Sequence, residues 1–395
     1  MTTAEAPSVN LAEIVARIAP IAKENAEISE RECNLAQPVV EAMIEERLFK
    51  TLTPRSLGGL EMNPVEYHDI IEMLARVDGS TAWCAWIPGA GAWGASTSPD
   101  DVAEETLSPK NACGAGALFP MGRADAVEGG YRVSGRWPYA SGCGHATTLG
   151  GACNTFDGDK MRMSPFGMPE IRMVSVPASE ARILDTWHVS GLAGTGSHDI
   201  TIEDKFVAER YTRSFGPGVP KGKHFQSKTY DFPFLGIFGS PIASVACGIA
   251  QGAIDEAIRM SQTRKQIMSD VPMRERPVFQ LHIADAIAAL SSARAWHREE
   301  VAAVWTTVAA GGLPDLAARA RMNLAAANAT RSAAHATQLA YIACGGAANY
   351  LTSPLQRALR DVHATTQHAG TSPNNFEGSI KLILGLAPDN PMYLI

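Results

Sequence analysis

Apolar residues in the first hundred positions recur every three or four residues, the spacing of an amphipathic helix. The pattern is clearest at Leu11, Ile14, Val15, Ile18 and Ile21. A further helix is predicted over "PVEYHDIIEMLARVDGS", because Pro64 suits a first helical turn and Gly79 suits a helix end. The next segment, "STAWCAWIPGAGAWG", begins with a Ser/Thr cap, but Pro88 and several glycines should break it. Residues 9 to about 107 are therefore predicted to be helical.

The pattern changes near residue 111 to short alternating segments bounded by turn residues, which are typical of β-strands. Four such segments are "YRVSGRWPYASG", "IRMVSVPA", "RILDTWHVS" and "HDITIEDKFVAE". They indicate a compact β-domain or a barrel. From about residue 236 to the end the spacing is helical again, and frequent alanines would allow bundle helices to approach closely. The predicted organisation is a helical domain (1–110), a β-domain (111–215) and a helical bundle (216–395).

Composition narrows the class of protein. A net charge of −7 argues against general nucleic-acid binding, because no basic excess is present to neutralise phosphates. The seven cysteines are scattered without a C-x-x-C motif, which suits a reducing cytoplasm better than a disulfide framework. The first twenty residues lack the pattern of a signal peptide, and no charge-free run of eighteen apolar residues predicts a membrane span. We expect a soluble, cytoplasmic protein.

Two segments invite a phosphate or metal site. "GLAGTGSHD" (191–199) has three glycines but lies between predicted strands and lacks the phosphate-loop spacing, so a tight turn is favoured. His363 and His368 are five residues apart, which places them about 140° apart around a helix and disfavours a shared metal. A histidine beside an apolar stripe is more often solvated or hydrogen-bonded than catalytic. We therefore expect no metal.

Other side chains leave two interpretations open. Ser141 in "WPYASGCGH" could be a nucleophile, but it lacks the G-x-S-x-G context and is more simply the polar end of a strand. A set of aromatic residues could be core, or could line one cavity for a flat aromatic ligand. The set comprises Trp83, Trp86, Trp93, Tyr230, Phe232 and Phe234.

Taken together, the segments resemble the acyl-CoA dehydrogenase superfamily over almost the whole chain. "RSLGGL", "YRVSGRWPYASG", "DTWHVSGLAGTGSHDITIEDKFVAE" and "ACGGAANYLTSPLQRALRD" are similar to motifs of that family. The resemblance implies an α+β, mostly helical fold with an N-terminal helical domain, a central β-barrel domain and a C-terminal four-helix bundle. It also implies a homotetramer.

The resemblance implies where a flavin would bind. Trp137 corresponds to a tryptophan beside the flavin, and Tyr139, Ala140 and Ser141 follow it in the same motif. Arg264 falls where the family has an arginine for the flavin phosphates, although the Phe-Gly that usually follows is absent. Gly345 and Gly346 correspond to glycines that approach the flavin of a neighbouring subunit.

The segment "LRDVHATTQHAGTS" departs from the dehydrogenases. Many of them carry R-D-x-x-x-x-x-x-Y-E-G-T-S here, with the glutamate as the base that removes the α-proton of the acyl thioester. This chain has Arg360 and Asp361 in register, then His368, and Ala369 at the position of the base. A methyl group cannot accept a proton, so α,β-dehydrogenation lacks its general base.

A histidine just before the missing base and a serine after WPYA make the chain resemble the oxygenase components of two-component flavin monooxygenases, which share this fold. The resemblance implies a reduced flavin (FMNH2 or FADH2) from a separate reductase, O2, a C4a-hydroperoxyflavin and a small aromatic substrate contacted by Trp83, Trp86, Tyr230 and Phe234. It implies that His368 hydrogen-bonds the peroxide or the substrate hydroxyl, and that Ser141 hydrogen-bonds the flavin near N5. Three alternatives remain: an acyl-CoA dehydrogenase or oxidase with a relocated base, an N- or S-oxygenase of the same fold, and a binding protein that has lost activity.

Overall fold

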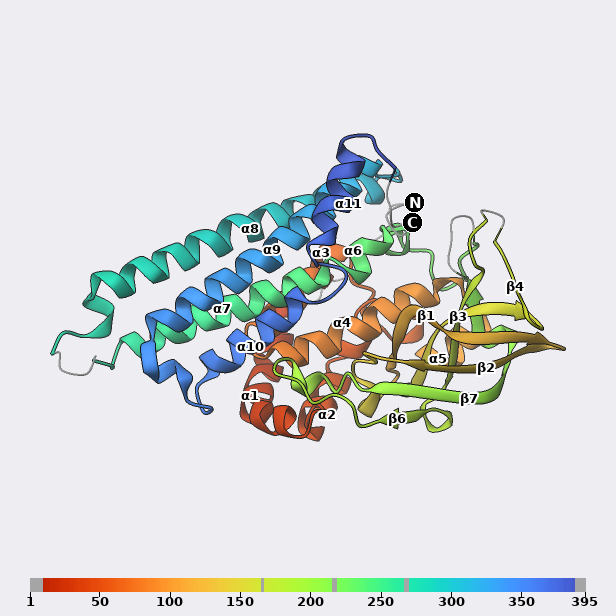
Figure 1. Ribbon diagram of the computed structural model, residues 1–395, viewed down its shortest axis with the longest axis horizontal. Helices are drawn as coiled ribbons and strands as arrows, with labels where there is room; N and C mark the ends of the chain where they lie inside the picture. Colours follow the sequence, from red (N-terminus) through yellow and green to blue (C-terminus); the bar gives the residue numbers. More distant parts are fainter. Residues whose placement is uncertain (1–9, 165–166, 215–218, 266–269, 388–395) are drawn as a thin grey trace.

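The computed structural model describes residues 10–164, 167–214, 219–265 and 270–387. Figure 1 shows a long helical bundle on one side, a β-sheet on the other, and helix α4 between them. The N-terminal helices are α1 (Leu11–Arg31), α2 (Gln37–Glu45), α3 (Pro64–Ala75), α4 (Gly79–Gly94) and α5 (Asp100–Leu107). The later helices are α6 (Phe234–Phe238), α7 (Pro241–Ser261), α8 (Pro277–Ala309), α9 (Leu316–Ala343), α10 (Pro354–Thr366) and α11 (Asn374–Ile383).

Helix α4 is continuous, so the predicted break at Pro88 is wrong. The helix starts with Asp78, whose carboxylate accepts the backbone N–H of Thr81 at 2.7 Å, and it runs through the proline. Tertiary packing stabilises the helix around the proline: almost the whole helix is buried, and the Tyr67 hydroxyl donates to the carbonyl of Trp86 at 2.6 Å. A helix buried on every side carries no amphipathic signal, which is why its sequence was misleading.

The β-domain is one sheet with the strand order β6-β7-β2-β1-β3-β5-β8, and β4 also pairs with β3. The strands are β1 (Gly114–Val127), β2 (Gly130–Trp137), β3 (Thr148–Asp157), β4 (Lys160–Met161), β5 (Ile171–Pro177), β6 (Arg182–Leu184), β7 (Asp199–Ala208) and β8 (Thr212–Ser214). Among the strands that the structure describes, β1 and β3 pair in parallel and the other pairs are antiparallel. Within the described ranges the terminal strands β6 and β8 do not pair with each other, so the sheet is open.

The two helical regions share one hydrophobic core, although the whole sheet separates them in sequence. Side chains from α1 to α4 pack with those of α7 to α10, and α3 lies against α7. The β-domain has a separate core of its own. The stretch Phe234–Ser261 is long and apolar enough to cross a membrane by length and composition, but 83% of its most apolar window is buried inside the protein, as in the core helix of a globular bundle.

Candidate active site

Four of the residues singled out in the sequence meet where α4, the sheet and the end of α10 come together. We call Trp83, Trp86, Ser141 and His368 the aromatic site. The ring of His368 lies edge-on to both indoles, with centroids 5.7 Å from Trp83 and 6.4 Å from Trp86. The two indoles are 5.4 Å apart, and Trp83 Nε1–H donates to Ser141 Oγ at 3.0 Å. These side chains come from three segments that lie far apart in the sequence.

His368 does not lie on the helix with His363. Helix α10 ends at Thr366, so the angle of about 140° predicted on a helical wheel does not describe the pair. His363 is exposed in the last turn, whereas His368 sits in the turn that follows. That turn is packed tightly: a Cβ on Gly370 would lie 3.0 Å from the Cα of Gly239 and 3.2 Å from Nδ1 of His368.

The hydrogen bonding of His368 determines which nitrogen faces a ligand. The backbone N–H of Gly370 donates to Nδ1 at 3.0 Å, so Nδ1 carries no proton and the neutral ring has its proton on Nε2. Burial lowers the pKa of His368 to about 4, which keeps the ring neutral near pH 7. The available group is therefore the Nε2–H donor. The structure favours a residue that donates a hydrogen bond to an oxygen over one that removes a proton.

Ser141 is presented by a strained turn. Tyr139 has φ +62° and Gly142 has φ +77°, both in the left-handed region, and a non-glycine residue there is uncommon. The turn buries the Ser141 hydroxyl between Trp83 and Ser197, whose Oγ is 2.6 Å away. Ser197 belongs to "GLAGTGSHD", which forms the predicted turns but also brings two buried hydroxyls, Thr195 and Ser197, to this site. The sequence feature that could have identified Thr195 and Ser197 is the presence of hydroxyl residues among the glycines of this segment.

The aromatic site fits a flat heteroaromatic group such as a flavin ring. The buried indole N–H of Trp86 has no hydrogen-bond partner among the described residues, and the bond from Gly370 to Nδ1 leaves Nε2–H as the donor of the His368 ring. Aromatic surface continues through Phe234 and Phe238, which stack with centroids 4.5 Å apart against Trp93. Unsatisfied donors beside aromatic walls are what a planar ligand with acceptor atoms requires.

Two predicted contact residues do not join the site. Tyr230 packs against Phe225, and its buried hydroxyl donates to the carbonyl of Leu52 at 2.9 Å, so its polar atom is already engaged within the protein. Trp137 is fully buried inside the β-domain, and its Nε1–H donates to the carbonyl of Ala152 at 2.8 Å. Trp137 therefore packs as part of the core of the β-domain.

The neighbours of Trp137 in the motif have different environments. Ala140 is buried, and its backbone N–H donates to the carbonyl of His198 at 3.0 Å, which pins the turn that carries Ser141. Tyr139 is 65% exposed and meets Trp187 edge-on at 6.0 Å. Tyr139 is accessible to a ligand that covers this surface, and Ala140 acts only through the backbone.

The other predicted flavin contacts lie at the opposite end of the bundle. Arg264 follows the last turn of α7, and Gly345 and Gly346 follow α9; we call these three residues the open end. Helix α7 begins beside the turn that carries His368 and has 21 residues, so its ends are roughly 30 Å apart (Figure 1). Arg264 is exposed, and a Cβ on either glycine would meet nothing within 4 Å.

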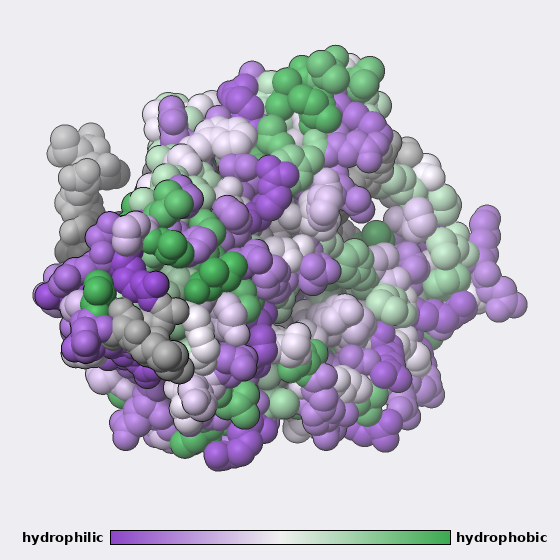
Figure 2. All heavy atoms as spheres, turned by 60° about the vertical axis from the view of Figure 1, so that its left-hand side comes forward, coloured by the Kyte–Doolittle hydropathy of each residue, from purple (hydrophilic) through white to green (hydrophobic). Residues whose placement is uncertain are grey.

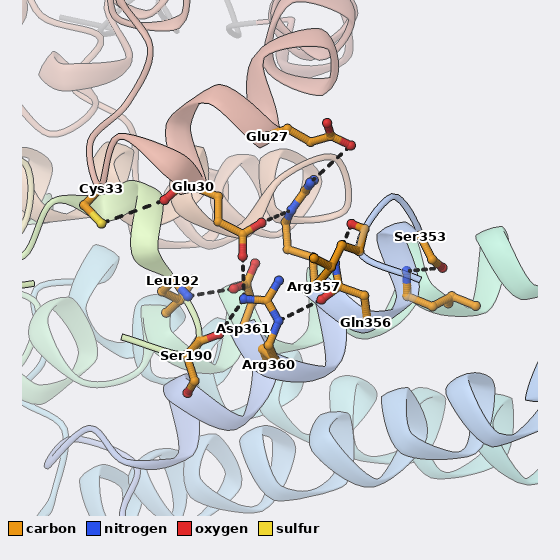
Figure 3. A network of polar contacts seen from close by, with 12 residues as sticks. Glu27, Glu30, Cys33, Ser190, Leu192, Ser353, Gln356, Arg357, Arg360 and Asp361 are labelled. Carbon is orange, nitrogen blue, oxygen red and sulfur yellow. Dashed lines mark hydrogen bonds and ion pairs between the residues drawn. The ribbon is translucent and has the colours of Figure 1, made fainter. Parts of the chain in front are cut away.

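A polar network fixes α10, and thus the turn after it, against the rest of the protein (Figure 3). Arg360 pairs with Glu30 of α1 and donates to the carbonyl of Ser190 at 2.6 Å. Asp361 accepts the backbone N–H of Leu192 at 2.6 Å, and burial raises its pKa to about 7. A Cβ on Gly191 would lie 2.2 Å from the carbonyl of Arg360, so only glycine allows this approach.

The position of the dehydrogenase base holds no acid. Ala369 occupies it with an exposed side chain, and burial accounts for the lowered pKa of His368. Nor do three or more His, Cys, Asp or Glu side chains gather as a metal site anywhere in the described part of the chain. The side chains that line the site are aromatic rings, hydroxyls and one neutral imidazole.

Comparison with known proteins agrees with this geometry. Residues 240–373 match the family described as acyl-CoA dehydrogenase, C-terminal domain. An indole-3-acetate monooxygenase from Pseudomonas putida is 31% identical over 359 residues, covering 91% of this chain and 90% of that protein. The oxygenase component of an FADH2-dependent resorcinol hydroxylase from Rhizobium sp. is 28% identical over 383 residues, covering 92% and 90%. The crystal structure of 3-HSA hydroxylase from Rhodococcus sp. superposes with a TM-score of 0.89 at 26% identity, covering 98% and 99%.

The fold and these matches place the protein among the acyl-CoA dehydrogenase-like flavoproteins, which confirms the fold class predicted from sequence. Within that class the chain belongs to the flavin-dependent monooxygenases, as an oxygenase component.

Proposed function

We propose that the protein uses reduced flavin and O2 to hydroxylate a small aromatic molecule in the aromatic site. The observation that carries this proposal is the convergence of His368 on Trp83, Trp86 and Ser141, beside an alanine where a dehydrogenase has its base. The relatives that act on indole-3-acetate and resorcinol support an aromatic substrate class. A reduced flavin supplies the electrons that activate O2.

The residues of the aromatic site have separate roles. The indoles of Trp83 and Trp86 provide flat walls that orient an aromatic ligand and exclude water. The Nε2–H of His368 donates a hydrogen bond to an oxygen held over the site, and the low pKa of the ring keeps Nδ1 unprotonated, so the residue acts as a neutral donor. The orphaned Trp86 Nε1–H supplies a second donor. A dry pocket with fixed donors favours transfer of oxygen over its loss as hydrogen peroxide.

We further propose a homo-oligomer, expected to be a tetramer, in which the open end of one copy completes the aromatic site of another. Arg264 lies about one helix length from His368 of the same chain, too far to contact the same ring system. Exposed apolar residues surround the open end, and Figure 2, which brings that side forward, shows apolar patches between polar ones. These exposed residues are Val278, Leu281, Ile342, Tyr350 and Leu351. A separate cytoplasmic reductase would supply the flavin, with FMN or FAD as its form.

The direct test mixes the purified protein with photoreduced FMN or FADH2 and ¹⁸O2, using indole-3-acetate and resorcinol as probe substrates. Incorporation of one ¹⁸O atom into the product, measured by mass spectrometry, is the expected result. A parallel reaction without protein controls for chemical oxidation. Absence of labelled product across an aromatic panel, together with failure to bind reduced flavin, would contradict the proposal.

A dehydrogenase or oxidase with a relocated base is distinguished by one observation on the same sample. Such an enzyme would hold oxidised FAD through gel filtration and would be bleached by an acyl-CoA thioester. We expect instead a nearly colourless protein that binds the reduced form more tightly. N- or S-oxygenation is tested by adding an amine and a sulfide to the substrate panel.

A further inference from the structure

We infer that Thr195 and Ser197 are positioning residues that hold Ser141 as a hydrogen-bond acceptor toward the ligand, and so make the site discriminate between reduced and oxidised flavin. This inference rests on the proposed function, and it concerns a chain of hydroxyls that begins at Trp83. Consecutive oxygens in the chain are 2.6 Å apart between Ser141 and Ser197 and 2.7 Å apart between Ser197 and Thr195.

The direction of every hydrogen bond in the chain follows from its last member. Thr195 Oγ1 is 2.7 Å from the carbonyl oxygen of Leu192, and a carbonyl has no proton to give, so Thr195 donates. A hydroxyl has one proton, so Ser197 must donate to Thr195. For the same reason Ser141 must donate to Ser197. The protons of all three hydroxyls therefore point away from the aromatic site.

One lone pair of Ser141 Oγ remains available for a further hydrogen bond. Trp83 Nε1–H donates to one lone pair of Ser141 Oγ, and the hydroxyl proton is committed to Ser197. A ligand can then reach Ser141 only with a donor, since two facing lone pairs repel each other. The three hydroxyls are all buried, with at most 4% of each residue exposed, so bulk water does not compete for their hydrogen bonds or change the direction of those bonds.

The direction of the hydrogen bonds in the hydroxyl chain is fixed at its Leu192 end. The carbonyl of Leu192 also accepts Trp187 Nε1–H at 3.1 Å. The backbone N–H of Leu192 donates to the buried carboxyl group of Asp361. Turning the chain around would leave the oxygens of Thr195 and Leu192 facing each other without a shared proton. Asp361, on α10, thereby ties the helix that precedes the His368 turn to the loop that contains Leu192 (Figure 3).

Flavin chemistry makes this polarity selective. Reduction of the isoalloxazine adds a hydrogen to a ring nitrogen that has only a lone pair in the oxidised form. A site that offers an acceptor at that nitrogen stabilises the reduced ring and repels the oxidised ring. A site whose hydroxyl can rotate freely would accommodate both, because it could donate to one form and accept from the other.

The test compares two variants at one position. Thr195→Val keeps the shape but removes the hydroxyl; Ser197 can then donate back to Ser141, which frees the Ser141 proton to turn toward the ligand. Thr195→Ser keeps the hydroxyl and is the matched control. We expect the ratio of dissociation constants, oxidised over reduced FMN, to fall about fivefold to tenfold in Thr195→Val and to stay within about twofold in Thr195→Ser.

Binding is measured by anaerobic titration with photoreduced FMN and by aerobic titration with FMN, without substrate or turnover. Ser197→Ala removes the acceptor of the Ser141 proton by another route and should lower the ratio in the same way, so it replaces Thr195→Val if that variant fails to fold. Thr330→Val, which removes a buried hydroxyl inside α9, controls for general loosening. If the parent binds reduced FMN preferentially and the ratio is unchanged in Thr195→Val or its replacement, the inference is overturned. A parent that binds neither form overturns the proposed function and the inference with it.

Discussion

The aromatic site and the open end are the two regions that the sequence assigns to one flavin, and they are built in opposite ways. In the aromatic site Trp83, Ser141 and His368 are held by hydrogen bonds to other buried groups of the same chain. At the open end Arg264 is exposed, and space surrounds Gly345 and Gly346. The first region is preorganised within one chain, whereas the second acquires a role only when another molecule covers it.

The largest expected effect is at the centre of the preorganised region. His368→Ala should still bind reduced flavin and consume O2, but product should fall by roughly 10²–10³-fold, the range for loss of one hydrogen-bond donor to a reacting oxygen. The O2 that no longer forms product should appear as hydrogen peroxide, because the donor that holds the oxygen is gone. The measurement is product formed per O2 consumed.

His363→Ala is the control for this variant, because its side chain is exposed on the last turn of the neighbouring helix. It should couple O2 use to product as the parent enzyme does. Equal coupling in His368→Ala and the parent would end the catalytic role of His368.

A smaller effect is expected at the open end. Arg264→Ala should weaken reduced-flavin affinity by about tenfold to a hundredfold with little change in folding, because a charge-assisted contact to phosphate is worth roughly 1.5–3 kcal/mol. Arg259→Ala, in the last turn of α7 and paired with Glu256, is the matched control. Unchanged affinity in Arg264→Ala would remove the open end from the flavin site.

The same variant can show whether the two regions cooperate between copies. Co-expression of His368→Ala with Arg264→Ala should restore some sites that have both residues intact, measured as product at limiting flavin. Simple averaging of the two variants would mean that each chain uses only its own residues.

A still smaller effect distinguishes the two regions by packing alone. Gly370→Ala places a Cβ 3.0 Å from the Cα of Gly239 and 3.1 Å from Cδ1 of Ile242, so we expect destabilisation of about 1–3 kcal/mol. Gly346→Ala meets nothing within 4 Å and should change stability by less than about 0.5 kcal/mol. Urea unfolding of both variants gives the comparison, and equal losses would mean that the open end is packed as tightly as the aromatic site.

The smallest expected effect is an absence of titration. Because the folded-state pKa of His368 is about 4, below its ordinary value of about 6.5, the ring should stay neutral as the pH falls from 8 to 5.5. Nitrogen-15 NMR of the labelled imidazoles, assigned with His368→Ala, should show constant His368 shifts over that range. A midpoint near 6.5 would show that solvent reaches the ring.

Much of the fold follows from sequence, because hydrophobic spacing reports which face of an element is buried. The order of helices, strands and bundle helices was predicted in this way, and α4 was misjudged because a helix buried all round has no such face. The sequence also identified Trp83, Trp86, Ser141 and His368, which the structure brings together.

The residues that the structure separates from the aromatic site share one physical property. Tyr230 and Trp137 are aromatic residues that satisfy their polar atoms inside the core, and residue type alone cannot separate them from Trp86, whose N–H is left unsatisfied. Thr195 and Ser197 were missed because a chain of hydroxyls depends on distances between segments and has no spacing along the sequence.

The core shared by the two helical regions has a consequence for how the chain is made. The partners of α3 in α7 are synthesised more than 160 residues later, after the entire sheet. The N-terminal helices must therefore wait on the ribosome with apolar faces exposed, while the β-domain, which has its own core, can fold as soon as it emerges. Such long-range pairing slows folding, and a chain that stops before α7 should aggregate or require a chaperone.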